Sequence, residues 1–300
     1  MAARRRSTAV NLLVSVRPGE WTKNTFVFAG LIFGRQLTEP GAVAASIAAF
    51  LIFCALAGAV YLVNDVADRE RDRQHPRKRF RPIASGALSP RVALGTAAVL
   101  IAGGLTASWW LRPAFGAVAT TYVSLLALYS GPLKHIVIID VLTIAIGFVL
   151  RVAAGAIAVD VPMSQWLLVC TILLALFMGL SKRRHELTLL ADGAIGHRRI
   201  LQEYSPYLLD QMISVVTAST LMAYVFYAIS EETAAKFGTS LLGLTIPFPL
   251  YGIFRYLYLV HHREGGGSPA ELLLNDRPLL ACVALWGLAV VVIIYRPFGV

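Results

Sequence analysis

The sequence predicts an all-α integral membrane protein with about nine transmembrane helices and a cytoplasmic N-terminus. Of its 300 residues, 57% are hydrophobic and 15% are charged, and the mean hydropathy is +0.67. Soluble domains carry about 25% charged residues, so this composition indicates a membrane protein. Two further observations support the prediction: long apolar segments recur along the chain, and Lys and Arg collect in alternate loops.

Most of the apolar segments begin at or near a proline. Proline suits the first turn of a helix because its missing N–H has no helical partner there. The predicted segments span residues 18–35, 40–66, 90–111, 113–130, 136–159, 163–182, 206–230, 238–260 and 277–295. Pro247 and Pro249 are expected to kink the eighth segment. We expect one transmembrane domain over residues 1–300.

The distribution of basic residues predicts the orientation of these segments. With the N-terminus in the cytoplasm, the N-terminal tail and the cytoplasmic loops hold twenty of the 27 Lys and Arg residues. This bias predicts a multi-pass protein of the cell inner (plasma) membrane whose functional loops face the cytoplasm. Those loops cover approximately residues 64–90, 130–136, 182–206 and 261–277.

The net charge of +10 could indicate either a nucleic acid or an anionic membrane surface as partner. The basic residues lie between apolar segments, which favours the membrane, and we expect no nucleic-acid partner. Cys54, Cys170 and Cys282 are isolated in apolar segments, without the spacing of a metal site or a disulfide. Small residues in several helices would permit close packing either within one subunit or between the subunits of a homo-oligomer.

The stretch from Asn64 to Arg81, NDVADRERDRQHPRKRFR, carries the strongest chemical signal. On a continuous helix, Asn64, Asp65, Asp68 and Asp72 would share about a quarter of the surface. Clustered oxygen ligands suit a hard cation such as Mg²⁺, with Mn²⁺ as an alternative, and the surrounding arginines suit phosphate. The simpler alternative is a solvated helix end with internal salt bridges.

Three other cytoplasmic stretches could complete such a site. Lys23 and Asn24 lie near the entry of the first segment, where Lys23 either binds a ligand or snorkels to the membrane surface. Asp140 lies several residues inside an apolar segment and requires a cationic partner, for which the candidates are a metal, Lys134 or Arg151.

The third stretch follows the sixth segment and contains three consecutive basic residues, Lys182, Arg183 and Arg184. These residues either bind phosphate or act as an ordinary positive-inside anchor. A cytoplasmic site with carboxylates and many cations fits an activated diphosphate bound through a metal, with a polyprenyl lipid entering from the bilayer. The residues alone do not decide which of the two substrates carries the diphosphate.

The pattern Asn64-Asp65-x-x-Asp68-x-x-x-Asp72 resembles the first aspartate-rich motif of UbiA-type membrane prenyltransferases, which have nine transmembrane helices. Longer stretches are similar to the decaprenyl-phosphate phosphoribosyltransferase branch of that superfamily. They are RPGEWTKNTFVFAGLIFG (17–34), HPRKRFRPIASG (75–86), LKHIVIIDVLTIAIGFVLRVAAGA (133–156) and SKRRHELTLL (181–190).

The resemblance implies transfer of 5-phosphoribose from 5-phosphoribosyl 1-diphosphate to decaprenyl phosphate, with release of diphosphate. The product would be decaprenylphosphoryl-5-phosphoribose, a precursor for the arabinan of cell-wall arabinogalactan. Quinone-type relatives usually carry a second motif with two or more acids, whereas this sequence offers Asp140 alone in the corresponding region. That departure favours the phosphoribosyl reaction.

The resemblance also implies roles for individual residues. Asp65, Asp68 and Asp72 would be the catalytic residues and the metal ligands. The substrate-binding residues would be Lys23, Asn24, Asn64, Arg71, Lys78, Arg81, Tyr129, Lys134, Asp140, Lys182, Arg183 and Arg184. The alternative enzyme is an aromatic-acceptor polyprenyltransferase that uses a polyprenyl diphosphate. The non-enzyme alternative is a lipid transporter, which should carry charges near the middle of the bilayer.

Overall fold

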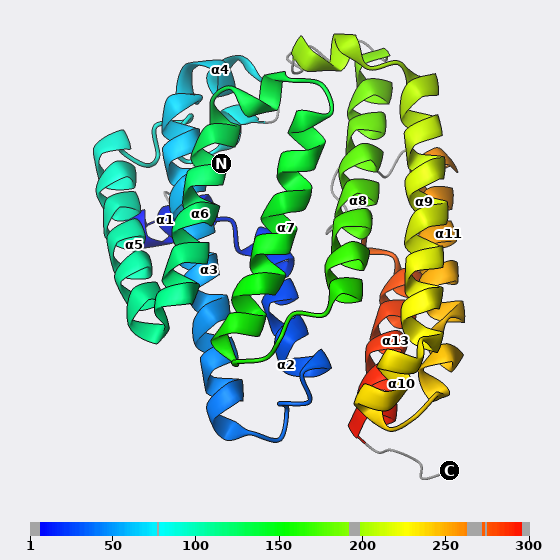
Figure 1. Cartoon of the computed structure of the whole chain (residues 1–300). Helices are drawn as coiled ribbons and strands as arrows, with labels where there is room; N and C mark the ends of the chain where they lie inside the picture. Colours follow the sequence, from blue (N-terminus) through cyan, green and yellow to red (C-terminus); the bar gives the residue numbers. More distant parts are fainter. Residues whose placement is uncertain (1–6, 77, 192–198, 263–271, 274, 296–300) are drawn as a thin grey trace. The chain divides into compact units, whose positions relative to one another are not determined.

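A computed structural model describes residues 7–76, 78–191, 199–262, 272–273 and 275–295, and every regular element in these ranges is a helix (Figure 1). The predicted all-α class is confirmed. The α-helices are α1 (Thr8–Ser15), α2 (Ala29–Phe33), α3 (Pro40–Ala67), α4 (Arg69–Gln74), α5 (Pro90–Leu111), α6 (Pro113–Ser130), α7 (Ile139–Ala158), α8 (Gln165–Ala191), α9 (Pro206–Ile229), α10 (Glu231–Phe237), α11 (Pro247–His262) and α13 (Arg277–Tyr295). Shorter 3-10 helices are η1 (Pro18–Phe28), η2 (Lys78–Phe80), η3 (Leu133–His135), η4 (Arg199–Glu203) and η5 (Leu241–Thr245).

Seven helices in the described residues are long and apolar enough to cross a membrane. They are α3, α5, α6, α7, α8, α9 and α13, and they correspond to seven of the predicted segments. Helices α5 and α6 begin at Pro90 and Pro113, as the sequence predicts, because each proline occupies the first helical turn. The prediction of nine crossings is not confirmed, and the cytoplasmic N-terminus stays a prediction.

The first predicted segment, residues 18–35, was expected to form one membrane helix, and the structure differs. These residues form the 3-10 helix η1 followed by the short helix α2, and neither helix alone is long enough to cross a membrane. Arg17 and Arg35 flank the two helices with left-handed backbone conformations, φ 56° and 57°. The polar residues Glu20 and Lys23 also interrupt the apolar run near its start.

The eighth predicted segment, residues 238–260, forms two helices, η5 and α11, in place of one. Helix α10 and the stretch from η5 into α11 together could form an eighth span, but they are bent by 103°. Pro247 is the first residue of α11. The proline therefore begins a helix, where it removes no helical hydrogen bond, and does not kink the middle of one.

The chain divides into two compact units. The first contains residues up to Leu31, Glu39–Leu133 and Leu150–Val161. In it α3 packs against α1, α5, α6 and η1, and the buried core includes Phe53, Phe115 and Tyr122. This unit carries the aspartate-rich end of α3. The prediction of one domain over residues 1–300 stays a prediction.

The second unit contains Ile32–Thr38, Lys134–Val149 and Pro162–Val300. Helix α8 packs against α9, and α11 packs against α13. Its largest buried cluster includes Phe177, Tyr204 and Tyr256. Helix α7 contributes its first half to this unit and its second half to the first one, so its two ends supply residues to two different polar clusters.

Candidate active site

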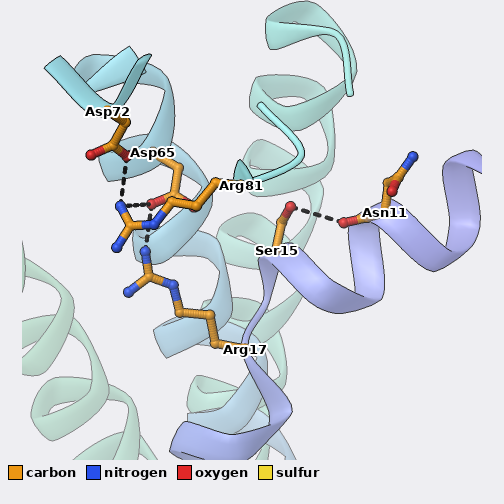
Figure 2. Close-up of polar contacts among 6 residues, drawn as sticks. All are labelled: Asn11, Ser15, Arg17, Asp65, Asp72 and Arg81. Atoms are coloured by element: carbon orange, nitrogen blue, oxygen red, sulfur yellow. Dashed lines mark hydrogen bonds and ion pairs between the residues drawn. The ribbon is translucent and has the colours of Figure 1, made fainter. Parts of the chain in front are cut away.

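The carboxylates of Asp65 and Asp72 meet at the guanidinium of Arg81, in the first unit (Figure 2). Arg81 Nη1 donates to Asp65 Oδ1 at 3.1 Å and to Asp72 Oδ2 at 2.6 Å. Both carboxylates are buried, at 3% and 4% exposed. Two buried acids that share one partner would repel each other, and the positive charge of Arg81 compensates for this repulsion.

Arg17 supplies a second cation to the same cluster. Its Nη2 donates to Asp65 Oδ1 at 2.5 Å, and its guanidinium lies 4.6 Å from the centre of the Tyr61 ring. Arg17 has a left-handed backbone between α1 and η1, an uncommon conformation for a non-glycine residue. Asn11 ties the preceding helix α1 to another segment, because its Nδ2 donates to the Ala87 carbonyl at 3.1 Å. Within α1, the Ser15 hydroxyl donates to the Asn11 carbonyl (Figure 2). The sequence did not single out Arg17 as a site residue.

Asp68 interrupts the predicted continuous helix. Helix α3 ends at Ala67 and α4 starts at Arg69, with Asp68 at the junction. The helical hydrogen bonds continue through this junction, since the Asp68 N–H donates to the Asn64 carbonyl and the Asp72 N–H donates to the Asp68 carbonyl, both at 2.8 Å. The side chains of Asn64 and Asp68 make no hydrogen bond or ion pair with the residues that the structure describes.

Arg69 is half-buried, and four other cations of this stretch are exposed. The side chains of Arg71, Lys78 and Arg79 are exposed. Arg73 is also exposed and pairs with Glu70 at 3.0 Å, as the alternative of a salt-bridged helix end predicts for part of the stretch. Arg77 lies outside the described residues. The stretch therefore combines a buried cluster of carboxylates and arginines with an exposed basic surface.

A second polar group in the first unit lies around Arg151 of α7. Arg151 Nε donates to Asn24 Oδ1 at 2.8 Å, and its Nη2 donates to the Tyr122 hydroxyl at 2.6 Å. Asn24 Nδ2 contacts the sulfur of Cys54 at 3.3 Å. Asn24 is thus buried against α7, whereas Lys23 forms an ion pair with Glu20 at the half-buried surface.

Close backbone packing brings η1 and α7 together. A Cβ on Gly155 would lie 1.8 Å from the Val27 carbonyl oxygen, and one on Gly30 would lie 2.7 Å from the Ala156 backbone. Only glycine permits this approach of the two backbones. The close approach places Asn24 within hydrogen-bonding distance of Arg151.

The partner of Asp140 differs from the sequence-based expectation. We expected a metal, Lys134 or Arg151, but Arg183 Nε of α8 donates to Asp140 Oδ2 at 2.8 Å. Both side chains are fully buried, Asp140 at 0% and Arg183 at 1% exposed, and Arg183 also pairs with Glu186. Arg183, which was expected to bind phosphate, therefore neutralises a buried acid in the second unit.

Tyr204 completes this cluster from the connection between η4 and α9. Its hydroxyl donates to Asp140 Oδ1 at 2.8 Å and accepts the Ile138 N–H at 2.7 Å. Burial is the main cause that raises the pKa of Tyr204 to about 12. The hydroxyl therefore remains a proton donor at neutral pH.

The remaining predicted residues are spread over both units. Arg184 pairs with Asp210 at 2.8 Å, and Lys182 is half-buried on the same helix. Tyr129 and Lys134 flank the turn between α6 and α7, and both are half-buried. Residues 192–198, 263–271 and 274 of the predicted cytoplasmic loops lie outside the described residues.

Residues 25–275 match the UbiA prenyltransferase family. The chain belongs to this family. It is 33% identical to decaprenyl-phosphate phosphoribosyltransferase of Mycolicibacterium smegmatis, over 92% of this chain and 89% of that protein. It is 32% identical to the enzyme of the same name in Corynebacterium glutamicum, over 97% of this chain and 88% of that protein. The resemblance to this branch of the UbiA family is thereby confirmed.

The fold is that of solved UbiA proteins. A UbiA homolog from Archaeoglobus fulgidus, determined with GPP and Mg²⁺ bound, superposes with a TM-score of 0.72 over 94% of this chain and 99% of its own. The two sequences are 18% identical, so the similarity establishes the shared fold. The chain is accordingly a multi-pass membrane protein with the UbiA fold.

Proposed function

We propose that this protein transfers 5-phosphoribose from 5-phosphoribosyl 1-diphosphate to decaprenyl phosphate. The observation that carries the proposal is the 32–33% identity, over about nine-tenths of the chain, to proteins named decaprenyl-phosphate phosphoribosyltransferase. The product, decaprenylphosphoryl-5-phosphoribose, would serve arabinan synthesis for cell-wall arabinogalactan. The reaction would take place at the cytoplasmic face of the plasma membrane.

The arrangement around Asp65 supports a diphosphate-bearing donor. Arg17 and Arg81 are held at the carboxylates, and Arg71 and Lys78 lie exposed on the same stretch. A leaving diphosphate accumulates negative charge as its bond to carbon breaks, and preorganised cations stabilise that charge. Arginine binds phosphate in a bidentate manner, which also orients the donor.

The donor atoms of the aspartates fit a divalent cation, and we assign Mg²⁺ to them, with Mn²⁺ as an alternative. Asp65 Oδ2, Asp72 Oδ1 and the Asp68 carboxylate accept no hydrogen bond from the described residues. In the described part of the chain, no group of three or more acids, histidines or cysteines is arranged to hold a metal ion by itself. Magnesium usually takes one or two carboxylates and completes its shell with water and substrate phosphate, so this donor set is sufficient. A bound cation would neutralise diphosphate charge.

The chemistry requires no general base from the protein. An anionic oxygen of the lipid phosphate attacks the ribosyl C1, and the bond from C1 to the diphosphate oxygen breaks with its electron pair leaving on diphosphate. The nucleophile is already ionised, so positioning and charge neutralisation are the main contributions of the chain. Arg81, Arg17, Lys78 and Arg71 would hold the donor, and Lys134 and Lys182 are candidates for the phosphate groups of either substrate.

The proposal is tested by incubating the purified protein with Mg²⁺, decaprenyl phosphate and labelled 5-phosphoribosyl 1-diphosphate. Label should enter the lipid phase. Asp72→Asn and Asp68→Asn should abolish transfer, whereas Asp160→Asn should not, since Asp160 is 77% exposed in its pair with Arg112, far along the sequence from the motif. If the protein instead condensed a polyprenyl diphosphate with an aromatic acceptor and left the ribosyl donor intact, it would be an aromatic prenyltransferase.

A further inference from the structure

A strained turn leads into α7, in the second unit. The Ile139 N–H donates to the Val137 carbonyl at 2.8 Å, which closes a three-residue γ-turn around Ile138. Ile138 has φ 69°. A γ-turn with positive φ is rare and strained, and a β-branched residue rarely adopts that conformation. Such strain persists only where neighbouring groups hold the backbone in place.

The hydroxyl of Tyr204 holds this turn, together with the hydrogen bonds that the Ile138 carbonyl accepts from the N–H groups of Val141 and Leu142. It accepts the N–H of the strained residue itself, at 2.7 Å, and donates to Asp140 Oδ1 at 2.8 Å. Asp140 is fixed in turn by Arg183 at 2.8 Å. One hydroxyl therefore joins the backbone before α7, the first turn of α7 and, through Asp140, helix α8.

A lysine lies shortly before this turn in the chain. Lys134 lies in η3, four residues before Ile138, is half-buried and makes no side-chain ion pair within the described residues. Its position relative to Asp140 depends on the path of residues 135–139. A change at Ile138 would redirect that path and move Lys134.

We propose that Tyr204 is a positioning residue that locks the γ-turn at Ile138 and so fixes Lys134 for binding the phosphate of the ribosyl donor. The inference rests on the proposed function for the identity of the donor, but the locking of the turn does not. Tyr204 does not touch the reacting atoms in this account. It acts through the backbone of residues 134–139.

The chain offers a matched control for the hydroxyl. Tyr256 is buried in the same apolar cluster as Tyr204, and its hydroxyl has no hydrogen-bond partner in the described residues. Tyr204→Phe and Tyr256→Phe each remove one buried hydroxyl, but only the first removes hydrogen bonds. A difference between the two variants therefore reports the hydrogen bonds of Tyr204 and not the loss of a buried oxygen.

The test measures transfer kinetics and amide hydrogen exchange in the full-length protein. Tyr204→Phe should raise the KM for 5-phosphoribosyl 1-diphosphate about tenfold with kcat little changed, because ground-state binding is lost. The exchange of the Ile138 amide should become faster. Tyr256→Phe should leave KM and exchange as in the wild type. Unchanged KM and unchanged exchange in Tyr204→Phe would overturn the proposal.

A second variant distinguishes the effect of Tyr204 on the γ-turn from its effect on the stability of the whole protein. Ile138→Gly removes the strain because glycine adopts positive φ freely, and Ile138 is 45% exposed, so little packing is lost. In the double variant, Ile138→Gly should reverse part of the rise in KM that Tyr204→Phe causes. If Tyr204→Phe does not fold alone, the comparison is made in the Ile138→Gly background, and failure to fold there too would assign Tyr204 to stability and overturn the proposal. An inactive wild type would refute the proposed ribosyl donor. Hydrogen exchange at Ile138 would still test whether Tyr204 holds the γ-turn.

Discussion

Arg81 illustrates how one residue can satisfy two buried charges. Its guanidinium bridges Asp65 and Asp72, so the acids that we assign to the metal are also held by the protein itself. Removing one partner of a buried charge pair leaves the other uncompensated, which costs more than the pair contributes. The aspartate-rich motif therefore depends on a residue that lies nine positions beyond its last acid.

We predict that Arg81→Gln lowers kcat/KM for phosphoribosyl transfer about a hundredfold, as removal of a preorganised cation at a leaving group should. The measurement is label transfer at saturating lipid. Arg112→Gln is the control, because Arg112 forms only an exposed ion pair with Asp160. If Arg81→Gln and Arg112→Gln were equally active, Arg81 would have no role in binding the donor.

Tyr204 gives the cluster a defined pH dependence. Burial raises the pKa of this residue from 10 to about 12 in the folded protein. The folded state therefore binds the proton more tightly than the unfolded state, so the stabilisation is complete below pH 10 and is lost as the pH rises towards 12. The gap in Tm between the wild type and Tyr204→Phe should stay constant up to about pH 10 and shrink above it. A constant gap at higher pH would show that the hydroxyl does not titrate as described.

At the scale of helices, the contact of η1 with α7 positions the polar group around Arg151. Gly155→Ala would place a methyl group 1.8 Å from a backbone oxygen, so the two helices must separate. We predict a loss of about 1–3 kcal/mol in stability, the usual cost of overpacking, together with weaker contact between Asn24 and Arg151. Thermal unfolding in detergent measures the effect.

Gly103→Ala, on α5, is a control for which we expect no loss of stability. A Cβ at Gly103 meets no atom within 4 Å, and alanine favours a helix over glycine by about 1 kcal/mol. This variant should be as stable as the wild type or more so. If both alanine variants behaved alike, the close approach of η1 to α7 would be wrong.

Local signals in the sequence predicted helix boundaries well and long-range pairing poorly. The prolines at positions 90 and 113 mark the first residues of α5 and α6 because they act within one turn. The pairing of Asp140 with Arg183 joins residues 43 positions apart. The need of Asp140 for a cation was predictable from its burial cost, but the identity of that cation follows from packing of α7 against α8. Tyr204, beside Ser205-Pro206, has no local signature of its role.

For the whole molecule, the structure has two compact units, each with its own buried ion cluster. One holds Asp65, Asp72, Arg17 and Arg81, and the other holds Asp140 and Arg183. The spacing of the acids at a helix end was enough to predict the motif of UbiA-type enzymes. The cations that stabilise those acids could not be predicted, because Arg17 contacts Asp65 from a left-handed turn that no spacing rule predicts.

The orientation of the chain is a prediction at this scale. Ser85→Cys should react with a membrane-impermeant thiol reagent only after permeabilisation, because its loop is predicted to be cytoplasmic. Lys236→Cys should react in intact cells. The wild type is the control for its own three cysteines, of which Cys54 and Cys282 are buried and Cys170 is half-buried. The opposite labelling pattern would invert the topology and place the aspartates outside.

The most direct test of the central claim is the transfer of label from 5-phosphoribosyl 1-diphosphate to decaprenyl phosphate by the purified protein. We predict that a labelled lipid carrying phosphoribose forms with Mg²⁺, is suppressed by a chelator and is absent with Asp72→Asn. An unlabelled lipid phase, obtained while a related decaprenyl-phosphate phosphoribosyltransferase labels it under the same conditions, would contradict the account.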